Sequence, residues 1–153
     1  MKIAIGSDHA GFELKEKIKR YLLGKGLDVE DCGTHSADSV DYPDYARTVS
    51  EQVAAKRADT GVLVCGTGIG MSIAANKIPG IRAAHVTSEI EAQMSREHND
   101  ANVLTVGGRV LSEPTALAII ERWLSTKFSG GRHQLRINKI SELEKEKAHA
   151  ASS

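Results

Sequence analysis

Short apolar runs alternate with longer amphipathic segments along the whole chain. The runs KIAIGS (Lys2–Ser7), TGVLVCG (60–66) and ANVLTVGG (101–108) are almost continuously apolar. Such runs predict strands that are buried on both faces, as in a parallel sheet. Two shorter runs, DVEDCG (28–33) and IRAAHV (81–86), bring the number of expected strands to five.

The segments between these runs have the periodicity of helices. In the first of them Leu14, Ile18 and Leu22 recur at helical spacing, and Ser88 and Ser112 are suitable N-caps for two later ones. The expected helices cover 11–26, 41–58, 70–78, 88–99 and 112–128. Strands that alternate with helices of this length indicate βαβ units.

These units predict one α/β domain over residues 1–147, a Rossmann-like α/β/α sandwich with a five-stranded parallel sheet. Crossovers in such a sheet are right-handed, so helices should cover both of its faces. The chain's length of 153 residues suits a single domain. Residues 148–153 (AHAASS, with Ala148 first) are small and polar and are expected to form a frayed tail.

An additional C-terminal helix is expected over 132–148, after a sheet that is already complete. Its apolar residues Leu135, Ile137, Ile140 and Leu143 need a surface on which to be buried. Two arrangements are open. The helix packs on its own domain, or it lies as an arm across a second subunit, which would favour a homo-oligomer.

Composition and charge exclude several classes of protein. Lys+Arg and Asp+Glu both number 20, and this zero net charge removes the simplest case for binding nucleic acid or a membrane surface. No apolar run reaches the ~18 residues of a membrane span, and the N-terminus reaches Asp8 too soon for a signal peptide. We therefore expect a cytoplasmic protein. Cys32 and Cys65 are expected to be free thiols, and their spacing does not suit a zinc site.

Polar residues and glycines follow three of the expected strands. In open parallel sheets, ligands bind beyond the carboxyl ends of the strands, so these residues are candidates for one site. They are Asp8 and His9 after the first strand, Cys65, Gly66, Thr67, Gly68 and Gly70 after the third, with Ile69 inside that turn, and Arg109 after the fifth.

The turn CGTGIG (65–70) is the most informative stretch. Its alternating glycines let the backbone bend sharply and turn its N–H groups toward an anion, although a tight turn without a ligand is the alternative. The spacing matches neither a dinucleotide fingerprint nor a Walker A loop. Cys65, at the start of a helix, would be stabilised as a thiolate and could act as a base or nucleophile. Otherwise it is a small buried hydrophobe.

Other candidates are weaker when taken alone. Asp8 and His9 could hold a sugar hydroxyl and a phosphate, or could cap a loop. His98 is the acid/base candidate of EHND, because histidine titrates near neutrality. Arg132 and Arg136 are four residues apart, so both project from one helix face and could bind a phosphate, or form a solvated face. The remaining histidines share no ligand spacing, so no metal is expected.

Six stretches in this order and spacing resemble the type B ribose-5-phosphate isomerase family, which includes galactose-6-phosphate isomerase subunits. They are GSDHAG, DYPDYA, CGTGIGMSIAANKIPGIRAA, SREHNDANVL, GGRV and GGRHQLRI, and the resemblance covers Met1 to about Lys147. It implies an aldose–ketose isomerase that interconverts ribose 5-phosphate and ribulose 5-phosphate through an enediolate, in the pentose phosphate pathway, with no cofactor. An isomerase of allose or galactose 6-phosphate, or a non-catalytic phosphate- or nucleotide-binding module, is the alternative.

The resemblance also implies a role for each site residue. Cys65 would be the base that moves a proton between the first two sugar carbons. Thr67 and His98 would open the furanose ring, with His98 as proton donor. The implied substrate ligands are the turn Gly66–Gly70 for the enediolate, Asp8 and Asn99 for sugar hydroxyls, and His9, Arg109, Arg132 and Arg136 for the phosphate.

In the family, the side of the site with His98, Asn99 and Arg109 comes from a second subunit. The resemblance therefore implies a homodimer, or a dimer of dimers, that shares its active sites between subunits. One branch of the family uses a glutamate at the position of Met71 instead of the cysteine. Cys65 and Met71 place this chain in the cysteine branch.

Overall fold

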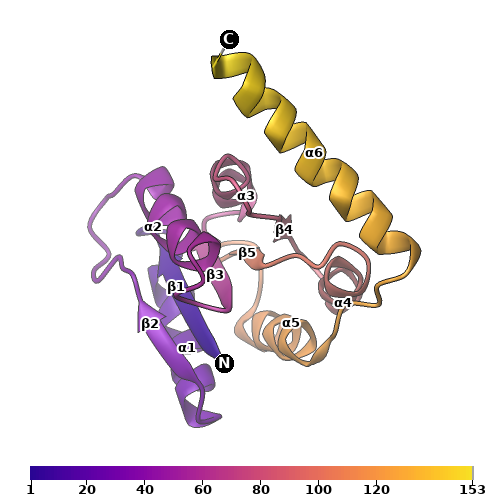
Figure 1. Ribbon diagram of the computed structural model, residues 1–153. Helices are drawn as coiled ribbons and strands as arrows, with labels where there is room; N and C mark the ends of the chain where they lie inside the picture. The colour runs from indigo at the N-terminus through magenta and orange to yellow at the C-terminus, as the bar shows by residue number, and fades with distance from the viewer. Residues whose placement is uncertain (153) are drawn as a thin grey trace.

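The computed structural model describes residues 1–152 and contains the five expected strands, all parallel. The strands lie in the order β2-β1-β3-β5-β4. This arrangement, with helices between the strands, confirms the predicted Rossmann-like fold (Figure 1). The elements are β1 (Lys2–Ser7), α1 (Phe12–Gly24), β2 (Asp28–Asp31), α2 (Tyr42–Ala54), β3 (Thr60–Cys65), α3 (Ile69–Ala75), β4 (Ala83–His85), α4 (Glu89–Glu97), β5 (Val103–Gly107), α5 (Glu113–Ser125) and α6 (Arg132–Ser152).

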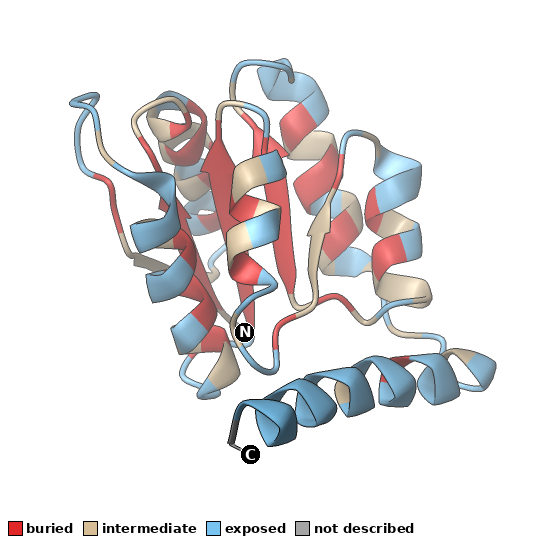
Figure 2. Ribbon diagram, turned by 90° about the horizontal axis from the view of Figure 1, so that it is seen from above, coloured by how far each residue is buried: buried red, intermediate tan, exposed pale blue. Residues whose placement is uncertain are grey.

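Helices cover both faces of the sheet, as expected. One buried cluster lies under α1, α4 and α5 and includes Ile18, Leu104 and Trp123. The other lies under α2 and α3 and includes Val49 and Leu63. The central strands contribute to both clusters and are buried along their length (Figure 2). Each large apolar side chain buried in this way stabilises the fold by roughly 1.5–3 kcal/mol.

The topology fixes where a ligand can bind. From β1 the chain crosses to β2 on one side, and it then returns to β3 and forms β4 and β5 on the other side, with β5 between β3 and β4. The crevice at such a reversal, outside the carboxyl ends of the strands, is the usual ligand site of open α/β sheets. Ser7 lies beside Val64 in the register of β1 and β3, and Cys65 lies beside Gly107 of β5. Asp8, which follows β1, and Cys65, the last residue of β3, therefore border this crevice.

The helix starts that were predicted from serine caps are confirmed. The Ser88 hydroxyl accepts a hydrogen bond from the Glu91 N–H at 3.2 Å, and the Ser112 hydroxyl accepts one from the Thr115 N–H at 3.3 Å. These bonds satisfy backbone donors that have no partner within the helix. No helix among the described residues is long and apolar enough to cross a membrane.

The last helix, α6, lies along the edge of the sheet where the strands begin (Figure 2). Ile137 is buried against the domain, but Leu135, Ile140 and Leu143 remain 67%, 47% and 63% exposed. The helix is assigned to Ser152, and alanine, the strongest helix former, occupies three of the positions from 148 onward. That this end frays stays a prediction. Ser153, the last residue of that expected tail, lies outside the described residues.

Candidate active site

The predicted site residues fall into two groups at different places in the chain. The first, which we call the strand-end group, consists of Asp8, His9, Cys65 to Gly70 and Arg109. The second, which we call the helix-end group, consists of His98, Asn99, Arg132 and Arg136. His133 also belongs to the helix-end group, because its ring stacks on that of His98 with centroids 4.5 Å apart and an interplanar angle of 15°.

The sulfur of Cys65 is held by the glycine turn that follows it. Cys65 is 5% exposed, and its Sγ accepts a hydrogen bond from the Gly68 N–H at 3.2 Å. Gly68 has a φ of +86°, and a Cβ there would lie 2.8 Å from the carbonyl carbon of Val106. Only glycine suits this position. The geometry places a backbone donor on the sulfur.

Two amides of the turn already have partners inside it. The Gly68 N–H donates to sulfur, and the Ile69 N–H donates to the Thr67 hydroxyl oxygen at 3.2 Å. The family resemblance implies that the whole turn Gly66–Gly70 binds the enediolate. The structure narrows this assignment, because these two N–H groups serve to shape the turn.

Asp8 and His9 are both held by nearby backbone. Asp8 is 7% exposed, and its Oδ1 accepts the Gly11 N–H at 3.0 Å, so the loop cap that the sequence left open is present. His9 Nδ1 accepts the Val40 N–H at 3.1 Å. Because Nδ1 is an acceptor here, a neutral His9 carries its hydrogen on Nε2.

Arg109 belongs to the strand-end group. The backbone N–H of Arg109 donates to the Gly66 carbonyl at 3.0 Å, and the backbone N–H of Gly108 donates to the Cys65 carbonyl at 2.8 Å. A Cβ built on Gly66 would lie 3.6 Å from Arg109 Cδ. Within one chain Arg109 therefore lies beside Gly66, because the loop after β5 returns to the end of β3. Its grouping with His98 and Asn99 on a second subunit stays a prediction.

Cations dominate the helix-end group. Burial, followed by the charges of His98, Arg132 and Arg136, lowers the pKa of His133. Within residues 1–152, Arg109, Arg132 and Arg136 form no ion pair, and all three are exposed. By contrast, Arg47, Arg82, Arg96 and Arg122 each bind a carboxylate. The three arginines predicted to bind phosphate are therefore available to an anion.

One chain does not bring the two groups together. Helix α4 runs back from the end of β4 to the start of β5, so His98, at the C-terminus of α4, lies at the edge where the strands begin. Cys65 and Thr67 lie at the opposite edge. The five residues of β5 between the two edges span about 17 Å. The predicted pair of Thr67 and His98 is therefore separated within a chain.

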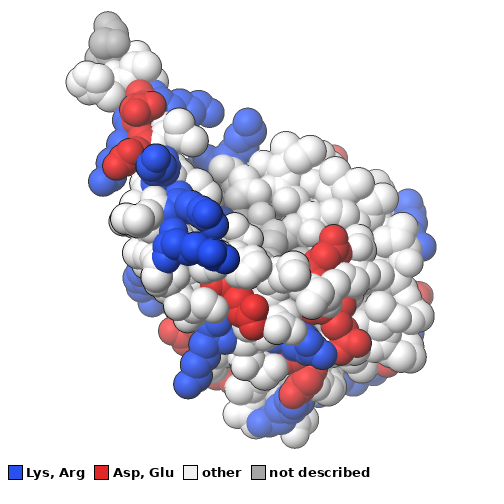
Figure 3. Space-filling model, turned by 90° about the vertical axis from the view of Figure 1, so that its right-hand side faces the viewer, with Lys and Arg blue, Asp and Glu red and all other residues white. Residues whose placement is uncertain are grey.

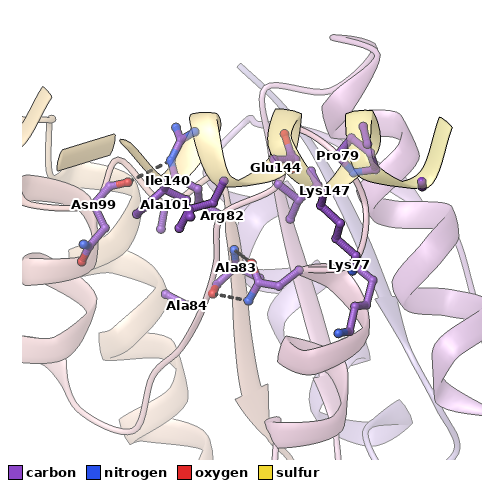
Figure 4. A pocket seen from close by; sticks show the side chains of 15 residues that line it. Lys77, Pro79, Arg82, Ala83, Ala84, Asn99, Ala101, Ile140, Glu144 and Lys147 are labelled. Carbon is purple, nitrogen blue, oxygen red and sulfur yellow. Dashed lines mark hydrogen bonds between the residues drawn. The ribbon is translucent and has the colours of Figure 1, made fainter. Parts of the chain in front are cut away.

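A groove of about 810 Å³ lies between α6 and the start of β4 (Figure 4). Its walls include Arg82, Ile140 and Lys147, and Glu144 of α6 accepts the Gly80 N–H at 3.0 Å beside it. Of the predicted site residues, Asn99 is the only one among the groove's described lining. Lysine and arginine side chains gather along α6 on the outer face of the molecule (Figure 3). The groove is the space under α6 and is separate from the Cys65 edge.

Sequence reasoning missed three groups that contact the strand-end group. The first is the Val40 N–H, which donates to His9. The second is Tyr42, which lies over the turn, since a Cβ on Gly70 would be 2.6 Å from the Tyr42 ring. His85 Nε2 lies 2.9 Å from the Thr67 carbonyl oxygen. The motif DYPDYA contains Tyr42, but no spacing signal identifies Val40 or His85, because both act on backbone or ring atoms of distant residues.

Comparison with known proteins identifies the class. A solved ribose-5-phosphate isomerase B of Clostridium thermocellum is 53% identical and superposes with a TM-score of 0.95 over 95% of this chain and 99% of its own. The Mycoplasma genitalium ribose-5-phosphate isomerase B, solved with bound ribulose-5-phosphate, is 43% identical, with a TM-score of 0.92 over 95% of this chain and 97% of its own. Both are sugar-phosphate isomerases.

The family described as ribose/galactose isomerase matches residues 3–140. The Escherichia coli protein named ribose-5-phosphate isomerase B is 48% identical over 143 residues, which are 94% of this chain and 96% of that protein. The chain belongs to the ribose/galactose isomerase family. This confirms the resemblance seen in the sequence and the expected class, an aldose–ketose isomerase of sugar phosphates.

Proposed function

We propose that this protein interconverts ribose 5-phosphate and ribulose 5-phosphate, a step of the pentose phosphate pathway, with Cys65 as the base. The substrate is suggested by the names of the relatives and by the ribulose-5-phosphate bound to the Mycoplasma genitalium enzyme. The observation that carries the proposal is the hydrogen bond from the Gly68 N–H to the Cys65 sulfur, at the crevice between β1 and β3.

The proton moves between two neighbouring carbons. The Cys65 thiolate takes the C2 proton of the open-chain aldose, and negative charge develops on O1. The amides of Gly66, Thr67 and Gly70 are the donors that the turn leaves for this oxygen. A fixed backbone donor of this kind stabilises such a charge by about 3–4 kcal/mol. The thiol then returns the proton to C1, and the hydroxyl proton of O2 moves to O1, which leaves a ketone at C2.

The remaining residues open the ring and hold the sugar. His98, with Thr67, donates a proton to the furanose ring oxygen. The side-chain oxygens of Asp8 and Asn99 accept hydrogen bonds from sugar hydroxyls. The phosphate is bound by the Nε2–H of His9 and by Arg109, Arg132 and Arg136. Because the phosphate is remote from C1 and C2, its binding energy serves to align the reacting carbons.

This scheme requires two copies of the chain, in a homodimer or a dimer of dimers. The strand-end group of one copy would face the helix-end group of the other, because they lie at opposite edges of a single sheet. The exposed Leu135, Ile140 and Leu143 of α6 support the arm arrangement that the sequence left open, since a second copy would bury them.

The test is turnover of ribose 5-phosphate by the wild type, Cys65→Ala and Cys32→Ala. We expect Cys65→Ala to lose about 10³-fold in kcat, as is typical when a general base is removed. Cys32→Ala is the matched control and should keep its activity, because burial and then the charges of Glu30 and Asp31 raise the pKa of Cys32 to about 11. Full activity in Cys65→Ala would refute the proposed base.

The same assay separates the alternatives. If allose 6-phosphate or galactose 6-phosphate gives the higher kcat/KM, the substrate is a six-carbon sugar and the assignment to ribose 5-phosphate is wrong. If ATP or NAD binds tightly and none of the sugar phosphates is turned over, the protein is a binding module.

A further inference from the structure

His85 contacts the turn that follows Cys65, across the end of β5. It is the last residue of β4, and β5 separates β4 from β3. The turn packs directly on the end of β5, since a Cβ on Gly107 would lie 2.6 Å from the Thr67 carbonyl oxygen. On the far side of β5 the turn meets the imidazole of His85, and a Cβ on Gly68 would lie 2.9 Å from its Cδ2. His85 thus supports the turn from the side opposite Cys65.

The contact determines which nitrogen of His85 carries a hydrogen. His85 Nε2 lies 2.9 Å from the Thr67 carbonyl oxygen. A carbonyl oxygen has lone pairs only, so Nε2 must be the donor. A neutral His85 is therefore the Nε2–H tautomer, and Nδ1 is unprotonated.

The same peptide unit connects His85 with the thiol. The Thr67 carbonyl and the Gly68 N–H belong to one planar peptide, and they point in opposite directions because that peptide is trans. The carbonyl accepts from His85, and the N–H donates to Cys65 Sγ at 3.2 Å. Once the carbonyl is held by His85, the N–H is aimed at the sulfur.

The turn needs such support because of its glycine. With no Cβ, glycine populates both signs of φ about equally well, so the Thr67–Gly68 peptide could rotate and remove its N–H from the sulfur. The hydrogen bond to His85 opposes this rotation. It also polarises the peptide and so strengthens the N–H as a donor.

We propose that His85 is a positioning residue that acts through the Thr67–Gly68 peptide to keep a backbone donor on the Cys65 sulfur. Its importance for catalysis rests on the proposed role of Cys65 as base. The structural part, that His85 keeps the Gly68 N–H on the Cys65 sulfur, is independent of any substrate.

The first test is alkylation of Cys65 by iodoacetamide in a Cys32→Ala background, where Cys65 is the remaining thiol. His85→Phe keeps a ring but has no donor, and we expect alkylation at neutral pH to slow by roughly tenfold, the effect of one hydrogen bond to a charged group. His85→Gln keeps an N–H donor and should restore most of the rate. His35→Phe makes the same chemical change at an exposed histidine and should leave the rate unchanged.

Alkylation of His85→Phe at the wild-type rate would overturn the proposal, and so would equal slowing in His85→Gln and His85→Phe. Steady-state kinetics give a second readout, a lower kcat with KM for ribose 5-phosphate within about twofold, because the phosphate ligands are untouched. If the wild type fails to isomerise the sugar, the proposed function fails, while the alkylation rates still decide the role of His85.

A measurement on the unaltered protein covers the case in which the variants do not fold. Nitrogen-15 NMR of the wild-type imidazoles should find His85 protonated at Nε2 and unprotonated at Nδ1. A spectrum with the hydrogen on Nδ1 would overturn the proposal, since Nε2 could not then donate to Thr67.

Discussion

The two edges of the sheet hold their functional residues in different ways. The strand-end group is fixed within its own chain, because Asp8, His9, Cys65 and Arg109 each have a hydrogen bond to neighbouring backbone. The helix-end group instead presents exposed cations that have no carboxylate partner within residues 1–152. One edge is held by hydrogen bonds within its own chain, and the other presents cations to solvent.

If the site is shared between two copies, as proposed, this difference divides its work between the two edges. Groups that must hold a reacting atom within a fraction of an ångström benefit from rigid strands and turns. Groups that bind a phosphate need charge and direction, which a helix face supplies. Four experiments test this difference.

The strongest test of two complementary edges is to mix two inactive variants. Cys65→Ala damages the strand-end group, and Arg132→Ala/Arg136→Ala damages the helix-end group. After unfolding and refolding together, a hybrid dimer has one site with both defects and one intact site. We expect about a quarter of wild-type activity from a statistical mixture. A mixture that stays as inactive as its components would mean that each site is built from a single chain.

Removing one arginine should weaken substrate binding without affecting the fold. Arg136→Ala should lower kcat/KM for ribose 5-phosphate by about 10- to 100-fold, the range for a hydrogen bond between charged groups. Lys139→Ala removes an exposed cation three residues further along α6 and is the matched control. Equal effects of the two changes would reduce the role of Arg136 to general attraction of an anion.

A buried lysine of α1 holds the loop after β2, which bonds the end of β1 at Ser7. Lys15 is fully buried and donates to Asp31 at 2.8 Å and to the Thr34 carbonyl at 2.5 Å, next to Ser7. We expect Lys15→Met to lower the free energy of unfolding by about 3 kcal/mol, because a carboxylate in a largely buried setting loses its main partner.

Lys19→Met is the control for that change. Lys19 binds the same Asp31 at 3.0 Å but is partly exposed, so its removal should cost about 1 kcal/mol or less. Urea unfolding measures both values. Similar losses in the two variants would show that the burial of Lys15 has no special importance.

The smallest effect is a dependence of stability on pH. Burial raises the pKa of Asp31, but hydrogen bonds from Lys15, the Gly33 N–H and Lys19 outweigh burial and hold it below the usual 3.8. A depressed carboxyl pKa contributes stability that is complete above the unfolded value and is lost as pH falls through the folded value. The wild type should therefore lose stability below about pH 4, with a flatter profile in Asp31→Asn. Identical profiles would contradict this account.

Much of the strand-end group could be predicted from the sequence, because it depends on local pattern. The buried runs at Ile3 and Val62 predict parallel strands, and the residues that follow such strands meet at one edge. Asp8 and Cys65 were found in this way. The roles of Val40 and His85 could not be predicted, since each acts through a contact between segments far apart in the chain.

For the helix-end group, the sequence predicts which residues belong to it but not where they lie. Arg132 and Arg136 stand out by their spacing, but the pattern does not say which edge of the sheet they reach. That depends on the path of α4 and α6. For the same reason the sequence does not predict that Arg109 lies beside Gly66, since this depends on the path of the loop after β5.

Exchange with solvent tests whether Cys65 carries the proton between C1 and C2. Ribose 5-phosphate is incubated in D₂O with the wild type or with Cys65→Ala, and deuterium at C2 of the recovered sugar is measured by NMR. We expect the wild type to incorporate deuterium, and Cys65→Ala to bind the sugar without incorporating it. Exchange at the wild-type rate in Cys65→Ala would contradict the account.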